Sequence, residues 1–345
     1  MRSISMNKIH LILPLCATFL ISSSVSLFAY SKGDIGTTGA DFLNLPVGAR
    51  AIAMGGAYVG LADDATAIYW NPAGLVQIPK ISATFMRAEY VDDISYQYAA
   101  YAHRISYDAV IGVSAFFTDI GSIERRDING LYGGTFAPKD EVYTLAYSKA
   151  IEEFSTDEYD VSMGLSLKYI SSKIDDSAKT WAGDFGVMTY NFGSIPYKLG
   201  VTAANIGSGL KYDVEESPLP LTFKFGGSAE ISDNFVLAAE VDVPKGAEVN
   251  YMAGAELSLQ PSQLMRFSAY AGINGQKLKD DLSGFSVGFG ATIQFFSLEY
   301  AFVPMGDLGS THRISLTFDF PFKRTPANRT ERTVFADMNS LEYNK

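Results

Sequence analysis

Hydrophobic and polar residues alternate along most of the chain. Residues 285–293 read Phe-Ser-Val-Gly-Phe-Gly-Ala-Thr-Ile, so that every apolar side chain falls on one face of an extended strand. The same alternation runs through residues 161–169, 296–302 and 313–320. Because successive side chains of a strand point to opposite faces, these segments are predicted to be strands with one apolar and one polar face.

Units of some ten alternating residues, each followed by a turn or loop, repeat from residue 81 to residue 322. This pattern is typical of the strands of a transmembrane barrel. We therefore predict an all-β fold, a transmembrane antiparallel β-barrel of about 14 strands. The strands are expected to start near Ile81, Tyr96, Ala109, Glu141, Tyr159, Trp181, Lys198, Leu221, Asn234, Val249, Leu264, Gly284, Phe295 and Arg313.

Charged residues keep to the polar face of these strands, and the opposite face is essentially uncharged. They are Lys168, Lys224, Glu230, Glu240, Asp242, Glu256, Arg266, Glu299, Arg313 and Asp319. A Lys or Arg facing lipid near the bilayer middle costs about 2–4 kcal/mol, which explains their absence from one face. The alternative is a soluble sandwich, whose outer faces would be richer in Lys and Glu than the small Gly, Ser and Ala found here.

The linkers between strands tend to alternate in length. Long linkers are expected over residues 119–140, 171–179, 207–220, 274–283 and 304–312, and short ones over 104–108, 191–196, 232–233, 260–263 and 294. Barrels of the outer membrane have brief periplasmic turns and longer outer loops. The linker 150–158 is longer than its place requires, which leaves open a count that differs by one pair of strands.

The first residues are typical of a secretory signal peptide. Arg2 and Lys8 precede an apolar stretch over residues 11–27, and Ala29 is a small residue at which a peptidase could cut. We predict a signal peptide over residues 1–29 and export to the outer membrane. A lipoprotein cysteine at Cys16 is disfavoured because Leu15 precedes it, and a retained anchor helix is disfavoured by the serines of residues 22–26. No later run of about 18 apolar residues follows.

Composition argues against several classes of function. A formal net charge of −11 repels nucleic-acid phosphate, and no basic stripe offsets it. The only cysteine lies in the predicted signal peptide, and the chain has 3 histidines. The pairs Asp63-Asp64 and Asp92-Asp93 lack further ligands at metal-binding spacing. We expect no enzyme activity, no cofactor and no metal, because His103 and His312 stand at strand ends, where polar interfacial residues are common.

Two blocks at the two ends of this region carry a resemblance to a known family. Residues 48–75 read GARAIAMGGAYVGLADDATAIYWNPAGL, and residues 298–316 read LEYAFVPMGDLGSTHRISL. They resemble the PorV/PorQ family, relatives of the FadL-type fatty-acid channels, from about residue 39 to residue 322. The resemblance implies a fourteen-stranded barrel over residues 80–322, with its lumen plugged by a short, partly helical N-terminal segment over residues 30–79. Residues 323–345 would form a periplasmic tail, expected to be disordered.

The residues of the plug segment agree with this implication. Asp64 is a suitable N-cap for a short helix over residues 65–69, and Pro72 would end it. Gly55 and Gly56 would let the backbone approach the barrel wall closely. The candidate plug residues, structural or ligand-gating, are Arg50, Gly55, Gly56, Asp63, Asp64, Tyr69, Trp70, Asn71, Pro72 and Gly74. We expect Arg50, Asp63, Asp64 and Asn71 to pair with luminal charges, and a purely structural role is favoured over direct ligand contact.

Two functions remain open. By resemblance, the barrel would serve as a scaffold or shuttle for protein export of the type IX kind, with secreted proteins or secretion components meeting its outer loops over residues 119–140 and 304–312. The candidate partner-facing residues are Met305, Gly306, Asp307, Leu308, Gly309 and His312. The alternative is FadL-like passage or binding of a hydrophobic small molecule. The luminal face, mostly small and charged apart from Val236, Met252 and Tyr270, favours the first.

Overall fold

The computed structural model describes residues 38–90, 94–155, 160–174, 176–190, 197–212, 215–276 and 284–320. The predicted signal peptide, residues 1–29, and the predicted tail, residues 323–345, lie outside these ranges, so both remain predictions.

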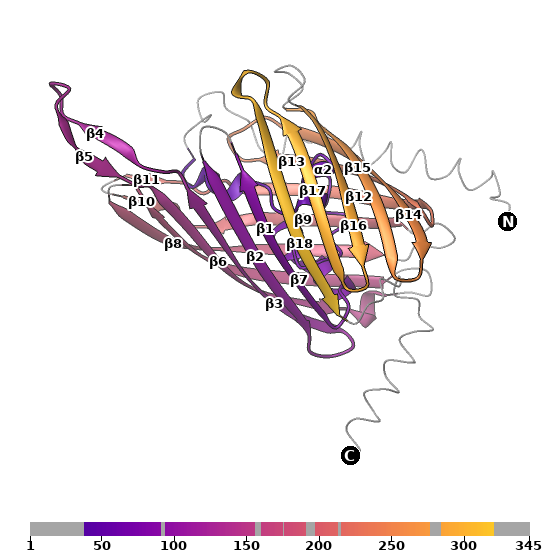
Figure 1. Ribbon diagram of the computed structural model, residues 1–345. Helices are drawn as coiled ribbons and strands as arrows, with labels where there is room; N and C mark the ends of the chain where they lie inside the picture. The colour runs from indigo at the N-terminus through magenta and orange to yellow at the C-terminus, as the bar shows by residue number, and fades with distance from the viewer. Residues whose placement is uncertain are drawn as a thin grey trace, which may run out of the picture.

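Fourteen strands of the described chain close into one antiparallel barrel, in which each strand pairs with its neighbours and β18 pairs with β1 (Figure 1). They are β1 (Ile81–Glu89), β2 (Ser95–Arg104), β3 (Ala109–Asp119), β6 (Lys139–Ala150), β7 (Asp160–Lys173), β8 (Ser177–Tyr190), β9 (Tyr197–Gly207), β12 (Thr222–Ser232), β13 (Phe235–Pro244), β14 (Asn250–Ser262), β15 (Met265–Asn274), β16 (Phe285–Ile293), β17 (Phe296–Pro304) and β18 (Ser310–Phe320). The predicted fold class and the strand count are confirmed.

Two small hairpins lie in the linkers at one end of the barrel. They are β4 (Ile123–Arg126) with β5 (Tyr132–Phe136), and β10 (Leu210–Lys211) with β11 (Glu216–Ser217). We call the end of the barrel that carries these hairpins the loop end. The opposite end, at which β1 begins and β18 ends, is called the turn end. Figure 1 shows the β4–β5 hairpin projecting beyond the barrel wall.

Two predicted outer linkers are shorter than expected. The linker predicted over residues 171–179 is reduced to residues 174–176, because β7 and β8 continue pairing as far as Lys173 and Ser177. The linker predicted over residues 304–312 shrinks to residues 305–309, which contain the 3-10 turn η6 (Gly306–Leu308). Here Ser310 already pairs with Pro304, so that His312 belongs to β18 and not to a loop. In the sequence, polar residues at the end of a strand resemble loop residues. In the structure, they continue the strand pairing of a hairpin beyond the apolar outer surface of the barrel.

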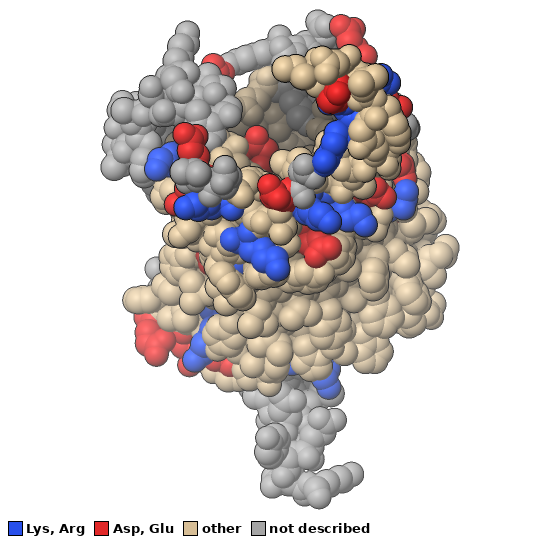
Figure 2. Space-filling model, turned by 90° about the vertical axis from the view of Figure 1, so that its left-hand side faces the viewer, with Lys and Arg blue, Asp and Glu red and all other residues tan. Residues whose placement is uncertain are grey.

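The predicted division between the two faces of the strands is confirmed. Outward side chains in mid-strand are large, apolar and exposed, as with Leu165 (58%) and Phe289 (60%). The ten charged residues predicted for the polar face are all buried or half-buried inside. In the face shown in Figure 2, charged residues gather towards the two ends, with an uncharged zone between them. An outer surface of this kind is what contact with lipid requires.

The residues before β1 lie inside the barrel, and we call residues 38–79 the luminal segment. It contains η2 (Asp41–Asn44), α2 (Ala49–Ala53), α3 (Ala67–Trp70) and η3 (Pro72–Gln77). The one further 3-10 turn of the described chain outside this segment and η6 is η4 (Glu152–Phe154). In the described ranges, no helix combines the length and apolar character needed to cross a membrane. The helix predicted over residues 65–69 begins two residues later, at Ala67.

Small residues on the inner face of the wall leave room for the luminal segment. A Cβ added at Gly272 would lie 2.0 Å from the backbone nitrogen of Gly55, and one at Gly200 would lie 2.2 Å from the carbonyl oxygen of Val59. Side chains at these positions would therefore displace the segment. The segment supplies most of the fully buried apolar side chains, including Met54, Tyr58, Leu61 and Ile68. The core of this barrel is thus the contact between the luminal segment and the wall.

Candidate functional site

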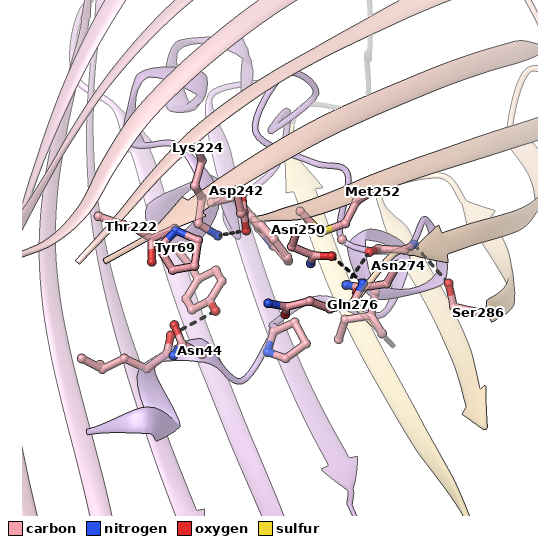
Figure 3. Close-up of a pocket in the computed structure, with 18 of the residues that line it drawn as sticks. Asn44, Tyr69, Thr222, Lys224, Asp242, Asn250, Met252, Asn274, Gln276 and Ser286 are labelled. Atoms are coloured by element: carbon pink, nitrogen blue, oxygen red, sulfur yellow. Dashed lines mark hydrogen bonds and ion pairs between the residues drawn. The ribbon is translucent and has the colours of Figure 1, made fainter. Parts of the chain in front are cut away.

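A cavity of about 280 Å³ lies in the lumen near the loop end, between the luminal segment and the wall (Figure 3). Nine strands contribute to it, mostly through residues near their loop ends. Its wall is formed by Lys168, Ala204, Asn205, Thr222, Lys224, Asp242, Pro244, Ala247, Asn250, Met252, Asn274, Gln276, Gly284, Phe285, Ser286, Val303 and Arg313, and its floor by Leu43, Asn44, Pro46, Ile52, Gly55, Gly56, Tyr69 and Trp70. Polar and apolar groups therefore share the lining.

Four candidate plug residues, Gly55, Gly56, Tyr69 and Trp70, line the floor. The indole nitrogen of Trp70 donates to the Val47 carbonyl oxygen over 2.9 Å, and the Tyr69 hydroxyl donates to that of Leu43 over 3.1 Å. Burial raises the pKa of Tyr69, so the phenol stays a neutral donor. These bonds hold α3 against η2 and against the residues between η2 and α2, and they fix the floor.

One wall of the cavity carries Lys224 and Asp242, which face each other from β12 and β13 (Figure 3). The Lys224 ammonium lies 3.6 Å from an Asp242 oxygen and 5.0 Å from the centre of the Trp70 ring. An ammonium over an indole face is attracted by the ring's negative face. Lys224 thereby ties the wall to the floor.

A break in strand pairing shapes the neighbouring wall. The register of β8 against β9 shifts between Gly183 and Phe185, and Asn205 adopts a positive φ of 63°. The Asn205 backbone N–H donates to the Asp184 carboxylate over 2.8 Å, instead of to the strand ladder. Lys168 pairs with Asp184 at 2.9 Å and donates to the Asn205 side-chain oxygen at 2.8 Å. This β-bulge turns an amide towards the cavity, a known use of bulges.

Arg50 is the centre of a buried ion-pair network beside the cavity. Its guanidinium lies 2.7 Å from Glu256 on β14 and 2.6 Å from Asp63 in the luminal segment, and it donates to the Tyr58 hydroxyl over 2.9 Å. Burial by itself disfavours the charge, but the carboxylates of Asp63 and Glu256 raise the pKa of Arg50 well above its usual value. Arg50 therefore joins the luminal segment to the wall as a permanent cation.

Other polar groups anchor the same segment. Glu240 on β13 accepts the backbone N–H groups of Tyr58 and Val59 through one oxygen, at 2.8 and 2.7 Å. The Tyr58 hydroxyl donates to Asp64, and burial raises the pKa of Tyr58, which keeps that donor protonated. Asp64 also accepts the backbone N–H of Thr66 over 2.8 Å. The prediction that Asp64 is the N-cap of this helix is wrong, because α3 begins at Ala67 with Thr66 as its N-cap and no side chain caps it.

Three candidate residues lie away from the cavity, where the segment meets the strands β6 to β9. Asn71 donates to the Val59 carbonyl oxygen over 3.0 Å and accepts the Ala73 N–H over 3.1 Å. Pro72 begins η3 directly after α3 has ended, as expected of a proline. A Cβ at Gly74 would lie 2.2 Å from the Ala62 carbonyl oxygen. Of the four polar residues expected to pair with luminal charges, Arg50 pairs with Glu256 on the wall. The contacts of Asp64 and Asn71 described above are with neutral groups of the luminal segment.

None of the candidate partner-facing residues lines the cavity in the described part of the chain. Met305 packs against the core, whereas Asp307 and Leu308 are exposed, and Gly309 has a φ of 89°. His312 faces outward, and its Nδ1 lies 2.7 Å from the Tyr300 hydroxyl. Such a pair at a strand end fits the aromatic girdle of a membrane barrel.

Sequence reasoning missed several residues that line the cavity, notably Asn205, Asn250, Asn274 and Gln276. Their shared signal is a polar amide near the loop end of a strand or in the loop beyond it, which by itself resembles a solvated loop residue. In the described residues, no group of three or more His, Cys, Asp or Glu side chains could hold a metal ion. The arrangement offers hydrogen-bond donors, acceptors and apolar contact to a small ligand.

The fold is similar to that of known membrane channels. The Pseudomonas putida toluene transporter TodX matches with a TM-score of 0.50 and 13% sequence identity, over 79% of this chain and 96% of TodX. A Pseudomonas aeruginosa FadL homologue matches at 0.49 and 10% identity, over 79% of this chain and 98% of that one. The CymD monoaromatic hydrocarbon channel matches at 0.48 and 15% identity, over 80% and 98%. At such identities the likeness shows the fold alone.

No protein-family model matches the chain, and no curated protein matches it. The likeness to TodX supports the barrel fold, and nothing in these comparisons supports the PorV/PorQ family specifically.

Proposed function

We propose that the protein is an outer-membrane barrel that binds a small amphipathic molecule in the luminal cavity and lets it pass when the luminal segment moves. The observation that carries this proposal is the 280 Å³ cavity held between the luminal segment and the wall. The mouth of a β-barrel is a common place for a small-molecule site, and such sites combine apolar lining with a few well-placed polar groups.

In the sequence, the many charged residues that face the lumen disfavour this function. The structure weakens that objection, since several of these charges are paired with one another. Arg50 is paired with Glu256 and Asp63, Lys168 with Asp184, and Lys224 with Asp242. These pairs fix the segment and the wall. Apolar groups such as Met252, Trp70 and Val303 still reach the cavity, so the lining suits a molecule with an apolar part.

Location in the outer membrane follows from the same physical argument as the fold. The outward faces of the strands are apolar over their middle, and the charges lie inside or towards the ends. The predicted signal peptide supplies the export that such a barrel needs. The fold shared with TodX, a toluene transporter, supports a role in transport, and no enzyme activity is proposed.

Passage can be tested with the mature chain in liposomes, by measuring uptake of small amphipathic solutes. Met252 faces the cavity on β14, and its neighbour Tyr251 faces outward. We expect Met252→Trp to fill the cavity and abolish uptake, and Tyr251→Trp to leave it unchanged. Uptake no faster than in empty liposomes, or equal in the two variants, would refute the proposal.

A second candidate function is the docking of a protein partner, as in an export scaffold of the PorV/PorQ kind. The observation that favours it is the β4–β5 hairpin, which projects from the loop end with Ile128, Leu131 and Tyr132 exposed. Exposed apolar groups on a projecting element commonly mark an interaction site. Deleting the gene and comparing secreted proteins tests this role, and an unchanged set of secreted proteins would exclude it.

A further inference from the structure

One cation of the cavity wall lacks the carboxylate partner that the others have. Arg313 on β18 is 1% exposed and lines the cavity. Its Nε donates to the Tyr96 hydroxyl over 3.1 Å, one terminal nitrogen donates to the Thr311 hydroxyl over 2.6 Å, and its charge lies 5.8 Å from the centre of the Tyr90 ring. All three partners are neutral. Among the described residues, no Asp or Glu forms an ion pair with Arg313.

This arrangement differs from that of Arg50, which has two carboxylates at 2.7 Å or less. Burying an unpaired charge is costly, and proteins normally pair it or use it. A guanidinium has five N–H donors, and the described contacts of Arg313 use two of them. The geometry therefore leaves Arg313 able to bind an anionic group that enters the cavity.

The cavity wall also contains buried hydrogen-bond acceptors that have no donor in the described chain. One oxygen of Asp242 and the side-chain oxygen of Asn274 are buried and have no hydrogen-bond partner in the described chain. Figure 3 shows both residues at the cavity, which Arg313 also lines. A buried acceptor that has no donor lowers the stability of the folded protein, so these oxygens suit a ligand with N–H or O–H groups. A hydrocarbon would leave both unsatisfied.

The size of the cavity limits the ligand further. Its volume of about 280 Å³ is near the lower limit for pockets that hold drug-sized molecules, and a long acyl chain would not fit within it. We propose that the luminal site takes a compact organic anion, a carboxylate or a phosphate ester, that also bears hydroxyl or amino groups. This inference rests on the proposed small-molecule function and names the class of ligand.

Binding can be followed through Trp70. The chain has 2 tryptophans, and the other, Trp181, is 57% exposed on the outer face. In a Trp181→Phe background the fluorescence of the purified mature barrel reports on the cavity floor alone. The probes are methylcyclohexane, cyclohexanecarboxylate, 4-hydroxycyclohexanecarboxylate and cyclohexyl phosphate, which share one ring and do not absorb with tryptophan.

We expect the anions to bind, either the two carboxylates or cyclohexyl phosphate, and methylcyclohexane to bind most weakly. Of the two carboxylates, 4-hydroxycyclohexanecarboxylate should bind more tightly than cyclohexanecarboxylate. The ranking of the acids against cyclohexyl phosphate identifies the anionic group. Arg313→Gln should weaken anion binding about tenfold or more, as expected for the loss of a charged hydrogen bond, and Arg313→Lys should restore part of it. Asn274→Leu should remove the preference for the hydroxylated acid.

The control is Arg87→Gln, since Arg87 lies on the exposed side of β1, and anion binding should be unchanged. Methylcyclohexane binding as tightly as the acids would overturn the inference, as would full anion affinity in Arg313→Gln. The first comparison uses the Trp181→Phe barrel alone and holds even where an Arg313 variant does not assemble. Anion binding without solute uptake would overturn the proposed passage only, and uptake without anion preference would overturn this inference only.

Discussion

Replacing Arg50 by alanine should release the luminal segment. The guanidinium pairs with Glu256 at 2.7 Å and with Asp63 at 2.6 Å, and both it and Glu256 are almost fully buried. Without Arg50, Glu256 keeps a buried charge that lacks its partner, and Asp63 and Tyr58 lose a donor. Breaking a buried pair by removing one member costs about 3–5 kcal/mol. The cost falls on the closed position of the segment, because the barrel ladder contains neither Arg50 nor Asp63.

The size of this penalty predicts a measurable opening. A loss of about 3 kcal/mol shifts an equilibrium between seated and displaced segment on the order of a hundredfold. We expect Arg50→Ala barrels in planar bilayers to open far more often than the unaltered protein, and to admit solutes that it excludes. Arg50→Ala combined with Glu256→Gln should open less often than Arg50→Ala alone, since one unpaired carboxylate is gone.

The matched control is Arg87→Ala. Arg87 and Glu89 form an ion pair with a similar distance, 2.6 Å, but their side chains are 61% and 58% exposed. Conductance of this variant should equal that of the unaltered protein. Equal conductance of the Arg50→Ala and unaltered barrels would refute the view that this network holds the segment in place.

Three further predictions concern the segment, the outer face and alkaline pH. Gly55→Ala should displace the segment and raise conductance, because its Cβ would lie 2.6 Å from the Ile273 backbone, whereas Gly121→Ala, at a similar φ of 76° but in open space, should leave conductance unchanged. Phe289→Arg, at the middle of β16, should cost about 2–4 kcal/mol and lower the folded fraction on gels, while Phe289→Leu should not. Burial raises the pKa of Tyr58, so the stability that the neutral phenol contributes is present below pH 10 and is lost as the pH rises further. Above pH 10 the unfolding temperature of Tyr58→Phe should therefore fall less steeply with pH than that of the unaltered protein.

The barrel could be predicted from the sequence because one physical constraint acts on every strand. Lipid excludes charge from one face, so Lys168, Glu240 and Arg313 all had to lie on the other. The ends of strands could not be predicted as well. Residues 171–179 are polar whether they form a loop or a hairpin beyond the lipid, and only the pairing of β7 with β8 decides between them.

The cavity could not be predicted, because it depends on contacts between distant parts of the chain. Asn205 reaches it through a bulge that places its N–H on Asp184, and no local pattern in β8 or β9 signals that bulge. The sequence could predict that Arg50 is a charged residue in the lumen, but it could not predict that Arg50 pairs with Glu256 and not with another luminal carboxylate. The unpaired Arg313 is visible only once all the pairs are known.

The proposed passage requires the luminal segment to move, and a disulfide between the segment and the wall would prevent that movement. A Cβ at Gly226 on β12 would lie 3.3 Å from the Cβ of Val59, close to the spacing of about 3.5–4.5 Å found in disulfides. Uptake by Val59→Cys/Gly226→Cys liposomes should fall to the level of empty liposomes when the protein is oxidised and recover on reduction, whereas uptake by each single variant should be the same before and after oxidation. Undiminished uptake by the fully oxidised double variant would contradict the account.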